Sequence, residues 1–298
     1  MNKSRKIIVT QRPDGFCIQF DAMASACEVI AEIDDKDLAN KIAKTVSEEV
    51  WRIEDKYSRY NPLSLCSQIN KGCGRPIEID DETFALLNFA DTCFQLSDGI
   101  FDLTSGVLRK VWRFDCTDNI PSQGSITKEL KNIGWQKIVY DNTKIILPSL
   151  MEIDFGGIGK EYAVDRALLL INALTDQPVL VNLGGDLATN LARKNGEPWQ
   201  VGVEHPGFVD KKTMVVSLFK GALATSGDAK RFLLKNGKRY SHILNAKTGW
   251  PIQNAPHSIT VSAPQCIQAG LLATLAQMQG ENAEQFLLEQ EIKHWAIR

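Results

Sequence analysis

The chain has 298 residues, of which 44% are hydrophobic and 23% are charged. This composition is ordinary for a folded protein with a sizeable core, and it excludes a disordered chain. The formal net charge of -2 gives no support for electrostatic binding of nucleic acid or of an anionic membrane. No apolar run approaches the roughly 20 residues that span a bilayer, so we expect no membrane segment.

The cysteines and the N-terminus bear on the compartment. Seven cysteines, an odd number with no Cys-x-x-Cys pair among them, are typical of free thiols under reducing conditions. The N-terminus has basic residues but neither an apolar segment nor a small-residue cleavage site, so we expect no secretory signal. The expected location is the cytoplasm.

The first half of the chain alternates strand-like and helix-like segments. Short β-type runs occupy 17–20 and 27–33, and apolar residues at helical spacing predict a long amphipathic helix over 37–60. A second helix is predicted over 81–97, and the polar stretch 115–124 is typical of a surface loop.

The second half adds further strands and shorter helices. The predicted strands are 144–148, 151–155, 178–185, 199–206, 214–227 and 258–264, and the predicted helices are 160–174, 269–280 and 282–290. Because strands and helices do not alternate regularly, the α+β class is favoured over a doubly wound parallel sheet. No convincing linker divides the chain, so we predict a single domain over residues 1–298.

A glycine-rich turn between a strand and a helix is the first chemical signal. In the segment DFGGIGK, residues 154–160, glycines allow close approach of a ligand, and the helix start presents free N–H groups to an anion. The spacing fits neither a phosphate-binding P-loop nor a dinucleotide-binding fingerprint. From these residues alone, phosphate binding and a plain strand-to-helix turn remain equally open.

Polar residues follow the ends of several other strands. Asp186 and Asp228 each stand beside glycine, and His242 precedes a turn-rich segment. Read singly, these are capping aspartates and a structural histidine. With Asp102 and Asp154 they could also supply oxygen ligands to Mg²⁺, although aspartate is common in turns.

Seven segments taken together are more specific than any one of them. They are 22–25 (AMAS), 57–70, 97–104 (SDGIFDLT), 154–165 (DFGGIGKEYAVD), 182–186 (NLGGD), 226–228 (SGD) and 242–249 (HILNAKTG). In their order and local sequence they resemble the motifs of the ApbE family, the FAD:protein FMN transferases. The resemblance extends from about residue 21 to residue 280.

The resemblance implies both a fold and a reaction. The expected fold is α+β and ApbE-like, with mixed or antiparallel sheets flanked by helices in a single large domain. The expected activity is that of a Mg²⁺-dependent transferase, which splits the FAD pyrophosphate, moves FMN onto a Thr or Ser hydroxyl of a target protein and releases AMP. FAD as substrate, Mg²⁺ and an acceptor protein would be its partners.

Matching positions imply the site residues. Catalytic roles fall to His242 and Asp228, and metal ligation falls to the carbonyl of Gly157 and the hydroxyl of Thr274. The expected FAD-binding residues are Met23, Tyr60, Ile100, Phe101, Asp102, Asp154, Lys160 and Leu244.

The chain departs from the family at two acidic positions. Gly270 stands where the family has a metal-ligating Asp one helical turn before Thr274, and Asn245 stands where it has a second Asp. Because glycine cannot replace an anionic ligand, we expect a weakened metal site unless another carboxylate has taken over the role. Two alternatives therefore stay open beside transfer: an FAD-binding flavin carrier or regulatory partner with little or no transferase activity, and an FAD pyrophosphatase.

Overall fold

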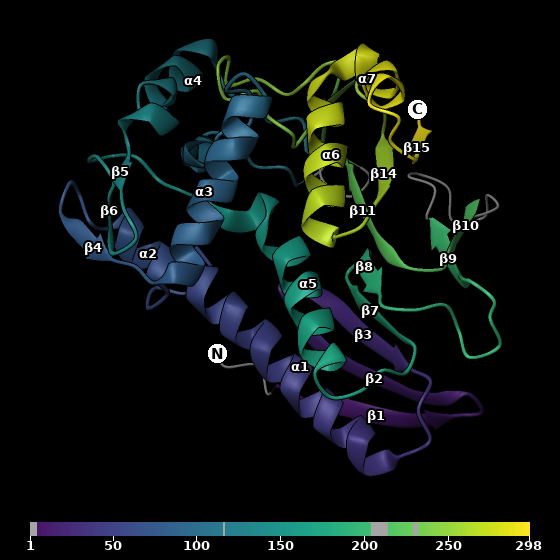
Figure 1. The fold of residues 1–298 in the computed structure, drawn as a ribbon. Helices are drawn as coiled ribbons and strands as arrows, with labels where there is room; N and C mark the ends of the chain where they lie inside the picture. Colours follow the sequence, from purple (N-terminus) through teal and green to yellow (C-terminus); the bar gives the residue numbers. More distant parts are fainter. Residues whose placement is uncertain (1–4, 116, 204–213, 229–231) are drawn as a thin grey trace.

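The computed structural model describes residues 5–115, 117–203, 214–228 and 232–298, and an eight-stranded antiparallel sheet organises them (Figure 1). Its strand order is β1-β2-β3-β7-β8-β11-β14-β15. The strands are β1 (Ile7–Arg12), β2 (Gly15–Ala22), β3 (Ser25–Ala31), β7 (Val179–Leu183), β8 (Asp186–Thr189), β11 (Gly221–Gly227), β14 (Ser258–Ala263) and β15 (His294–Ile297). Tight turns join β2 to β3 and β7 to β8. Because β3 pairs with β7, both turns lie at the same end of the sheet's strands.

Three helices pack against this sheet and against each other: α1 (Lys36–Tyr57), α5 (Gly159–Asn172) and α6 (Cys266–Met278) (Figure 1). Helix α1 begins where the Asp35 carboxylate accepts hydrogen bonds from two backbone N–H groups of the first turn. Its buried residues recur every three or four positions, which gives it one apolar face toward the core. Helix α7 (Ala283–Glu289) follows α6 and packs on it.

The start of α6 is fixed by a residue of α5. Both oxygens of the Asp165 carboxylate accept backbone hydrogen bonds, from the N–H of Cys266 at 2.8 Å and from that of Ile267 at 2.9 Å. The residue that precedes α6, Gln265, makes no side-chain cap of its own. Helix α6 is therefore capped from its neighbour, which ties the two helices together.

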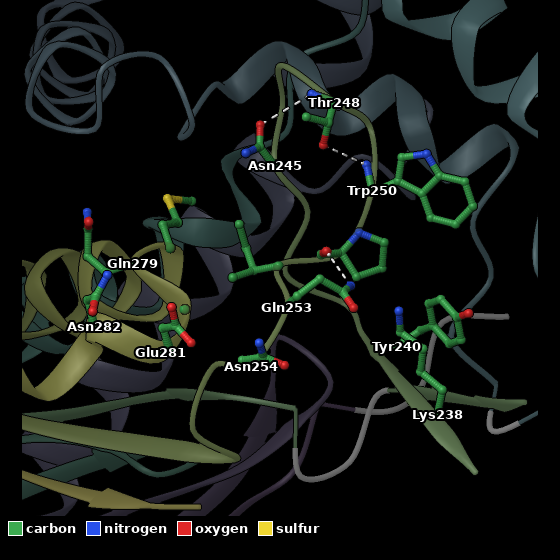
Figure 2. Close-up of a pocket in the computed structure, with 14 residues that line it drawn as sticks. Lys238, Tyr240, Asn245, Thr248, Trp250, Gln253, Asn254, Gln279, Glu281 and Asn282 are labelled. Atoms are coloured by element: carbon green, nitrogen blue, oxygen red, sulfur yellow. Dashed lines mark hydrogen bonds between the residues drawn. The ribbon is translucent and has the colours of Figure 1, made fainter. Parts of the chain in front are cut away.

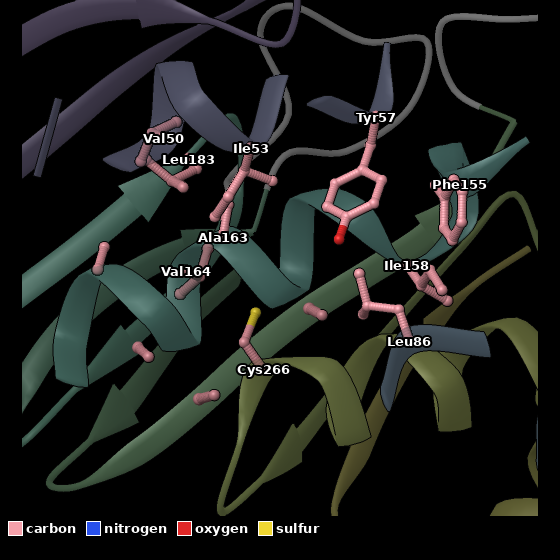
Figure 3. Packing of buried hydrophobic residues seen from close by; sticks show 14 of the residues in the cluster. Val50, Ile53, Tyr57, Leu86, Phe155, Ile158, Ala163, Val164, Leu183 and Cys266 are labelled. Atoms are coloured by element: carbon pink, nitrogen blue, oxygen red, sulfur yellow. The ribbon is translucent and has the colours of Figure 1, made fainter. Parts of the chain in front are cut away.

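The main core lies between the sheet and these helices (Figure 3). Ile53 of α1, Leu183 of β7, Val164 of α5 and Cys266 of α6 are all fully or almost fully buried in it. Phe155 joins the same cluster from the glycine-rich turn, so the turn is anchored in the core. Smaller clusters form around Trp112 and between β9 and the main sheet.

The other elements, short except for the 16-residue helix α3, complete the fold. They are α2 (Leu65–Asn70), β4 (Pro76–Glu78), α3 (Asp81–Leu96), η1 (Leu103–Lys110), α4 (Gln123–Leu130), η2 (Trp135–Lys137), β5 (Val139–Tyr140), β6 (Lys144–Ile146), η3 (Phe155–Gly157), β9 (Trp199–Val203), β10 (Met214–Leu218), β12 (Phe232–Lys235), β13 (Lys238–Ser241) and η4 (Gly280–Asn282), where η marks a 3₁₀ helix. β4, β6 and β5 form a small sheet, and β9–β10 and β12–β13 form two-stranded ribbons.

The predicted fold class is confirmed, since helices flank sheets whose described strand pairs are all antiparallel. The predicted strand over 151–155 is wrong. There the backbone N–H and C=O of Ile153 bond to the side-chain amide of Asn70, at 2.8 and 3.0 Å, in place of a neighbouring strand.

Other boundaries also differ from the sequence prediction, and the single strand predicted over 214–227 is divided into β10 and β11. Helix α1 stops at Tyr57 because Ser58 is extended, and the expected loop 115–124 includes the start of α4, where the Ser122 hydroxyl caps the helix. The predicted strand 199–206 is seen as β9 up to Val203, and its last three residues lie outside the described part. Within the described residues, no helix combines the length and apolar character needed to cross a membrane.

Candidate active site

The glycine-rich turn begins at Asp154, whose carboxylate holds the turn in place. One of its oxygens accepts a hydrogen bond from the N–H of Gly156 at 3.0 Å, and the other pairs with the guanidinium of Arg59. Helix α5 follows, and Ile158, the residue before it, provides no side-chain cap. The first N–H groups of α5 are therefore left for an anion, which the helix dipole also favours.

Three of the matched segments converge on Lys160. Its Nζ lies 3.8 Å from Oδ2 of Asp186, at the start of β8. Gly184, in the β7–β8 turn, has φ of +67°, and a Cβ there would lie 2.6 Å from the Ser25 side chain and 3.6 Å from Lys160 Nζ. Glycine is required at this close approach, which brings the β2–β3 turn, the β7–β8 turn and the start of α5 together.

Arg59 is a site residue that the sequence analysis missed. Beyond its pairing with Asp154, it donates to the hydroxyl of Tyr60 at 2.7 Å, and its guanidinium lies 4.9 Å from the Tyr60 ring centroid. The Tyr60 side chain is 80% exposed, so its ring forms an open platform next to the glycine-rich turn. Such an arrangement can stack a flat ring and neutralise a nearby anion.

Met23 occupies the strained β2–β3 turn. Met23 and Ala24 have φ of +51° and +57°, a conformation that non-glycine residues rarely adopt. The Met23 N–H donates to Oε1 of Glu54 on α1 at 2.7 Å, which helps to hold the turn against the helix. The predicted contact of Met23 with FAD therefore starts from a fixed backbone.

The segment from Ile100 to Asp102 lies against the glycine-rich turn. A Cβ at Gly157 would lie 3.4 Å from the Phe101 ring, so Phe101 covers the residue whose carbonyl is the expected metal ligand. The carboxylate of Asp102 is buried and accepts three hydrogen bonds, two from Thr104 and one from the N–H of Trp135. Burial nevertheless raises the pKa of Asp102.

Asp102 thus fixes the backbone around Phe101, and its FAD contact stays a prediction. Leu244 lies further away in the cluster around Trp112, paired through its backbone with Pro251. It is linked to the site through the neighbouring Ala246, whose N–H donates to the carbonyl of Ile100 at 3.2 Å.

Asp228 lies just beyond the end of β11 and is 7% exposed. Its Oδ2 accepts from Nε of Arg239 at 2.9 Å, and its Oδ1 lies 3.1 Å from Nδ1 of His257. The sequence analysis gave His257 no role, because no motif surrounds it. His242, the other expected catalytic residue, packs edge-on against Phe114.

The expected metal ligand Thr274 lies on α6, with its hydroxyl 3.4 Å from the hydroxyl of Ser226. One turn earlier on α6, Gly270 faces the carboxyl group of Glu161, which the sequence analysis also missed. Burial and the neighbouring Asp186 raise the pKa of Glu161 to about 8. In the described part of the chain no three His, Cys, Asp or Glu side chains form a metal-binding group.

Two surface hollows lie beside the site rather than in it. Figure 2 shows the first, where Asn245, Thr248 and Trp250 line one side and η4 lines another. The Asn245 side-chain oxygen accepts from the N–H groups of Lys247 and Thr248, so this residue holds a turn. The second hollow includes Asp102 but no other expected site residue. Neither contains the glycine-rich turn.

Comparison with known proteins agrees with this geometry. The sequence profile of the ApbE family matches residues 23–297. The FAD:protein FMN transferase of Chlamydia pneumoniae is 29% identical over 271 residues, 87% of this chain and 82% of its own, and that of Klebsiella pneumoniae is 30% identical over 241 residues, 78% and 74%. The crystal structure of an ApbE protein from Thermotoga maritima superposes with a TM-score of 0.82 at 28% identity, covering 98% of this chain and 94% of its own. The chain belongs to the ApbE family.

Proposed function

We propose that this chain is an FAD:protein FMN transferase. The observation that carries the proposal is the glycine-rich turn and the start of α5, where uncapped N–H groups and Lys160 follow Asp154, and Asp154 pairs with Arg59 beside the exposed ring of Tyr60. Such a site suits a pyrophosphate that joins a flat flavin to a nucleoside. Met23, Ile100, Phe101, Asp102, Asp154 and Leu244 complete the proposed FAD-binding set.

The reaction is a transfer of the FMN phosphoryl group. The oxygen of a Thr or Ser hydroxyl on the acceptor protein bonds to the FMN phosphorus, and the bond from that phosphorus to the bridging oxygen breaks. AMP leaves with the bridging oxygen, and the hydroxyl proton passes to a base. We assign this proton transfer to His242 and Asp228, with Asp228 held in place by Arg239.

The chain's contribution to the transfer is mainly positioning and charge. Lys160 faces the pyrophosphate, and the N–H groups of α5 bind the oxygens on which charge accumulates. Mg²⁺, when bound, would neutralise further phosphate charge, and the Gly157 carbonyl and the Thr274 hydroxyl would hold it. We place the protein in the cytoplasm, where unpaired thiols persist, and the proposed active unit is the whole domain, residues 1–298.

The test is incubation of the full chain with FAD, Mg²⁺ and an acceptor domain that carries a Thr in a flavinylation motif. We expect one covalent flavin per acceptor, seen as in-gel fluorescence, with an equal amount of AMP. The same acceptor with Val in place of that Thr is the control, and Asp228→Asn should lower the transfer rate by about 100-fold or more.

The alternatives give different results in the same assay. Bound FAD without covalent flavin and without AMP would identify a flavin carrier. AMP and free FMN in equal amounts, with an unmodified acceptor, would identify a pyrophosphatase.

A further inference from the structure

Glu161 fills the space that an acidic side chain at position 270 would occupy. It is the third residue of α5, and a Cβ built on Gly270 of α6 would lie 2.6 Å from its Cγ and 2.8 Å from its Oε1. No other neighbour comes as close to that Cβ position. The glycine of α6 and the glutamate of α5 are therefore complementary: the first leaves room, and the second places a carboxyl group in it.

The carboxyl group of Glu161 lacks the partners that a buried carboxylate needs. Its Oε2 is buried and has no hydrogen-bond partner among the described residues. A second carboxylate, that of Asp186, is close enough to disfavour ionisation of Glu161, and it is itself only 6% exposed. One ammonium group, Lys160, lies 3.8 Å from Asp186. Because two buried carboxyl groups share one lysine, a bound cation would favour their ionised forms.

The other acid of α5 is not available for this purpose. Asp165 uses both oxygens on the N–H groups that begin α6. Glu161 lies one turn before Asp165 on α5, and Gly270 lies one turn after Cys266 on α6. The hydrogen bonds between Asp165 and the start of α6 therefore also hold Glu161 opposite Gly270. The carboxyl group that carries the orphaned oxygen is thus held beside Gly270 by the hydrogen bonds that join the two helices.

Other oxygen donors lie on the same side of α6. Thr274 follows Gly270 by one turn, and its hydroxyl is 3.4 Å from that of Ser226. Mg²⁺ and Mn²⁺ prefer oxygen ligands and bind readily to one or two carboxylates together with hydroxyl, water and phosphate oxygens. The donor set around Glu161 fits such an ion.

We propose that Glu161 supplies the carboxylate ligand of the divalent cation in this chain, reaching from α5 into the space beside Gly270. The inference rests on the proposed function for the role of the cation, but its test does not depend on catalysis. With Glu161 as ligand, the metal site has a carboxylate even though position 270 of α6 is glycine. The weak metal binding that the sequence analysis expected would then not occur.

The test is a titration of the full chain with Mn²⁺ alone, followed by the loss of the electron paramagnetic resonance signal of the free ion, with Mg²⁺ as competitor. Glu161→Gln keeps the side-chain volume and should weaken Mn²⁺ binding at least about tenfold. Glu284→Gln, which alters a carboxylate on α7 paired with Arg298, is the matched control and should bind like the wild type.

A carboxylate exchange makes the assignment specific. Glu161→Gly should lose affinity as Glu161→Gln does, and the double variant Glu161→Gly/Gly270→Asp, which supplies the carboxylate from α6 instead, should recover binding to within a few-fold of wild type. Thermal unfolding checks that each variant folds.

Two results would overturn the proposal. One is equal Mn²⁺ affinity in wild type and Glu161→Gln, and the other is no wild-type site tighter than about 1 mM. Failure of the proposed function looks different: the wild type would bind Mn²⁺ through Glu161 yet leave the acceptor unmodified in the flavinylation assay.

Discussion

Asp102 and Glu161 are buried carboxyl groups near the starts of two helices, η1 and α5, and they are built into the protein in opposite ways. Both oxygens of Asp102 are occupied, by two hydrogen bonds from Thr104 and one from Trp135. In Glu161 one oxygen has no partner among the described residues and a second carboxylate lies nearby. Burial raises the pKa of both groups, so burial alone does not distinguish them.

The number of donors does distinguish them. A buried carboxylate whose oxygens are bonded to its own chain stabilises a turn, whereas one with an unused oxygen is suited to an external proton or cation. This contrast predicts that removing the two groups has opposite consequences for the stability of the metal-free protein.

The largest effect is expected for Asp102→Ala. The substitution leaves the N–H groups of Thr104 and Trp135 buried without an acceptor, and it should lower the free energy of unfolding by about 3 kcal/mol. Urea unfolding measures the change. Asp98→Ala removes an exposed carboxylate paired with Lys247 and should leave the midpoint where it is, so equal midpoints for all three proteins would contradict a structural role for Asp102.

The next largest effect is expected for Lys160, the lysine beside Asp186 and Glu161. Lys160→Ala should weaken FAD binding by roughly 1.5–3 kcal/mol, about 10- to 150-fold, because a hydrogen bond to a charged group is lost. FMN, which has one phosphate, should be affected less. Titration by flavin fluorescence gives both affinities, and Lys144→Ala, at an exposed lysine near Asp141, is the control. Equal losses for FAD and FMN would show that Lys160 does not contact the pyrophosphate.

A pH series sharpens the contrast for Glu161. Its pKa is about 8 in the folded protein against an ordinary 4.5, so folding favours the protonated form. That contribution to stability is complete below about pH 4.5 and is lost as the pH rises to about 8. In chelator, Glu161→Gln should therefore gain stability relative to wild type as the pH rises from 5 to 8. Parallel curves for the two proteins would contradict the assignment of the raised pKa.

The smallest effect tests the contact between the two helices. In wild type, Gly270→Ala places a methyl group against Glu161, and crowding offset by better helix propensity should cost about 1 kcal/mol net. In a Glu161→Ala background the same change should stabilise by about 1 kcal/mol. Unfolding of all four proteins forms a double-mutant cycle, and additive changes would mean that the two positions do not interact.

The fold was largely predictable because its helices and strands carry strong local patterns. The apolar periodicity of α1 reflects one buried face, and the β-branched run of β14 reflects a buried strand that is paired on both sides. The segment 151–155 has the same apolar character, but its backbone bonds to Asn70, 83 positions earlier, and no local pattern reveals that. The predicted strand failed there for this reason.

The site was predictable only where residues match the family's motifs. The turn from Asp154 to Lys160 was located from its glycines, and the structure brings it to Asp186. Arg59 and His257 were missed because their roles depend on contacts with residues 95 and 29 positions away. Glu161 was missed because its possible role depends on its contact with Gly270, which only the packing of α5 on α6 reveals.

The cap that Asp165 places on α6 has a consequence for ion size. Because two N–H groups that begin α6 are bonded to the Asp165 carboxylate of α5, these two hydrogen bonds hold the helices at a set separation at this point. A carboxylate on one helix and a hydroxyl on the other then span a fixed distance. A fixed span discriminates by ion size, because Mg²⁺ with its short, strict oxygen distances and Ca²⁺ with its longer bonds cannot both fit it equally well. Discrimination between Mg²⁺ and Ca²⁺ would then depend on Asp165, a residue that touches neither ion.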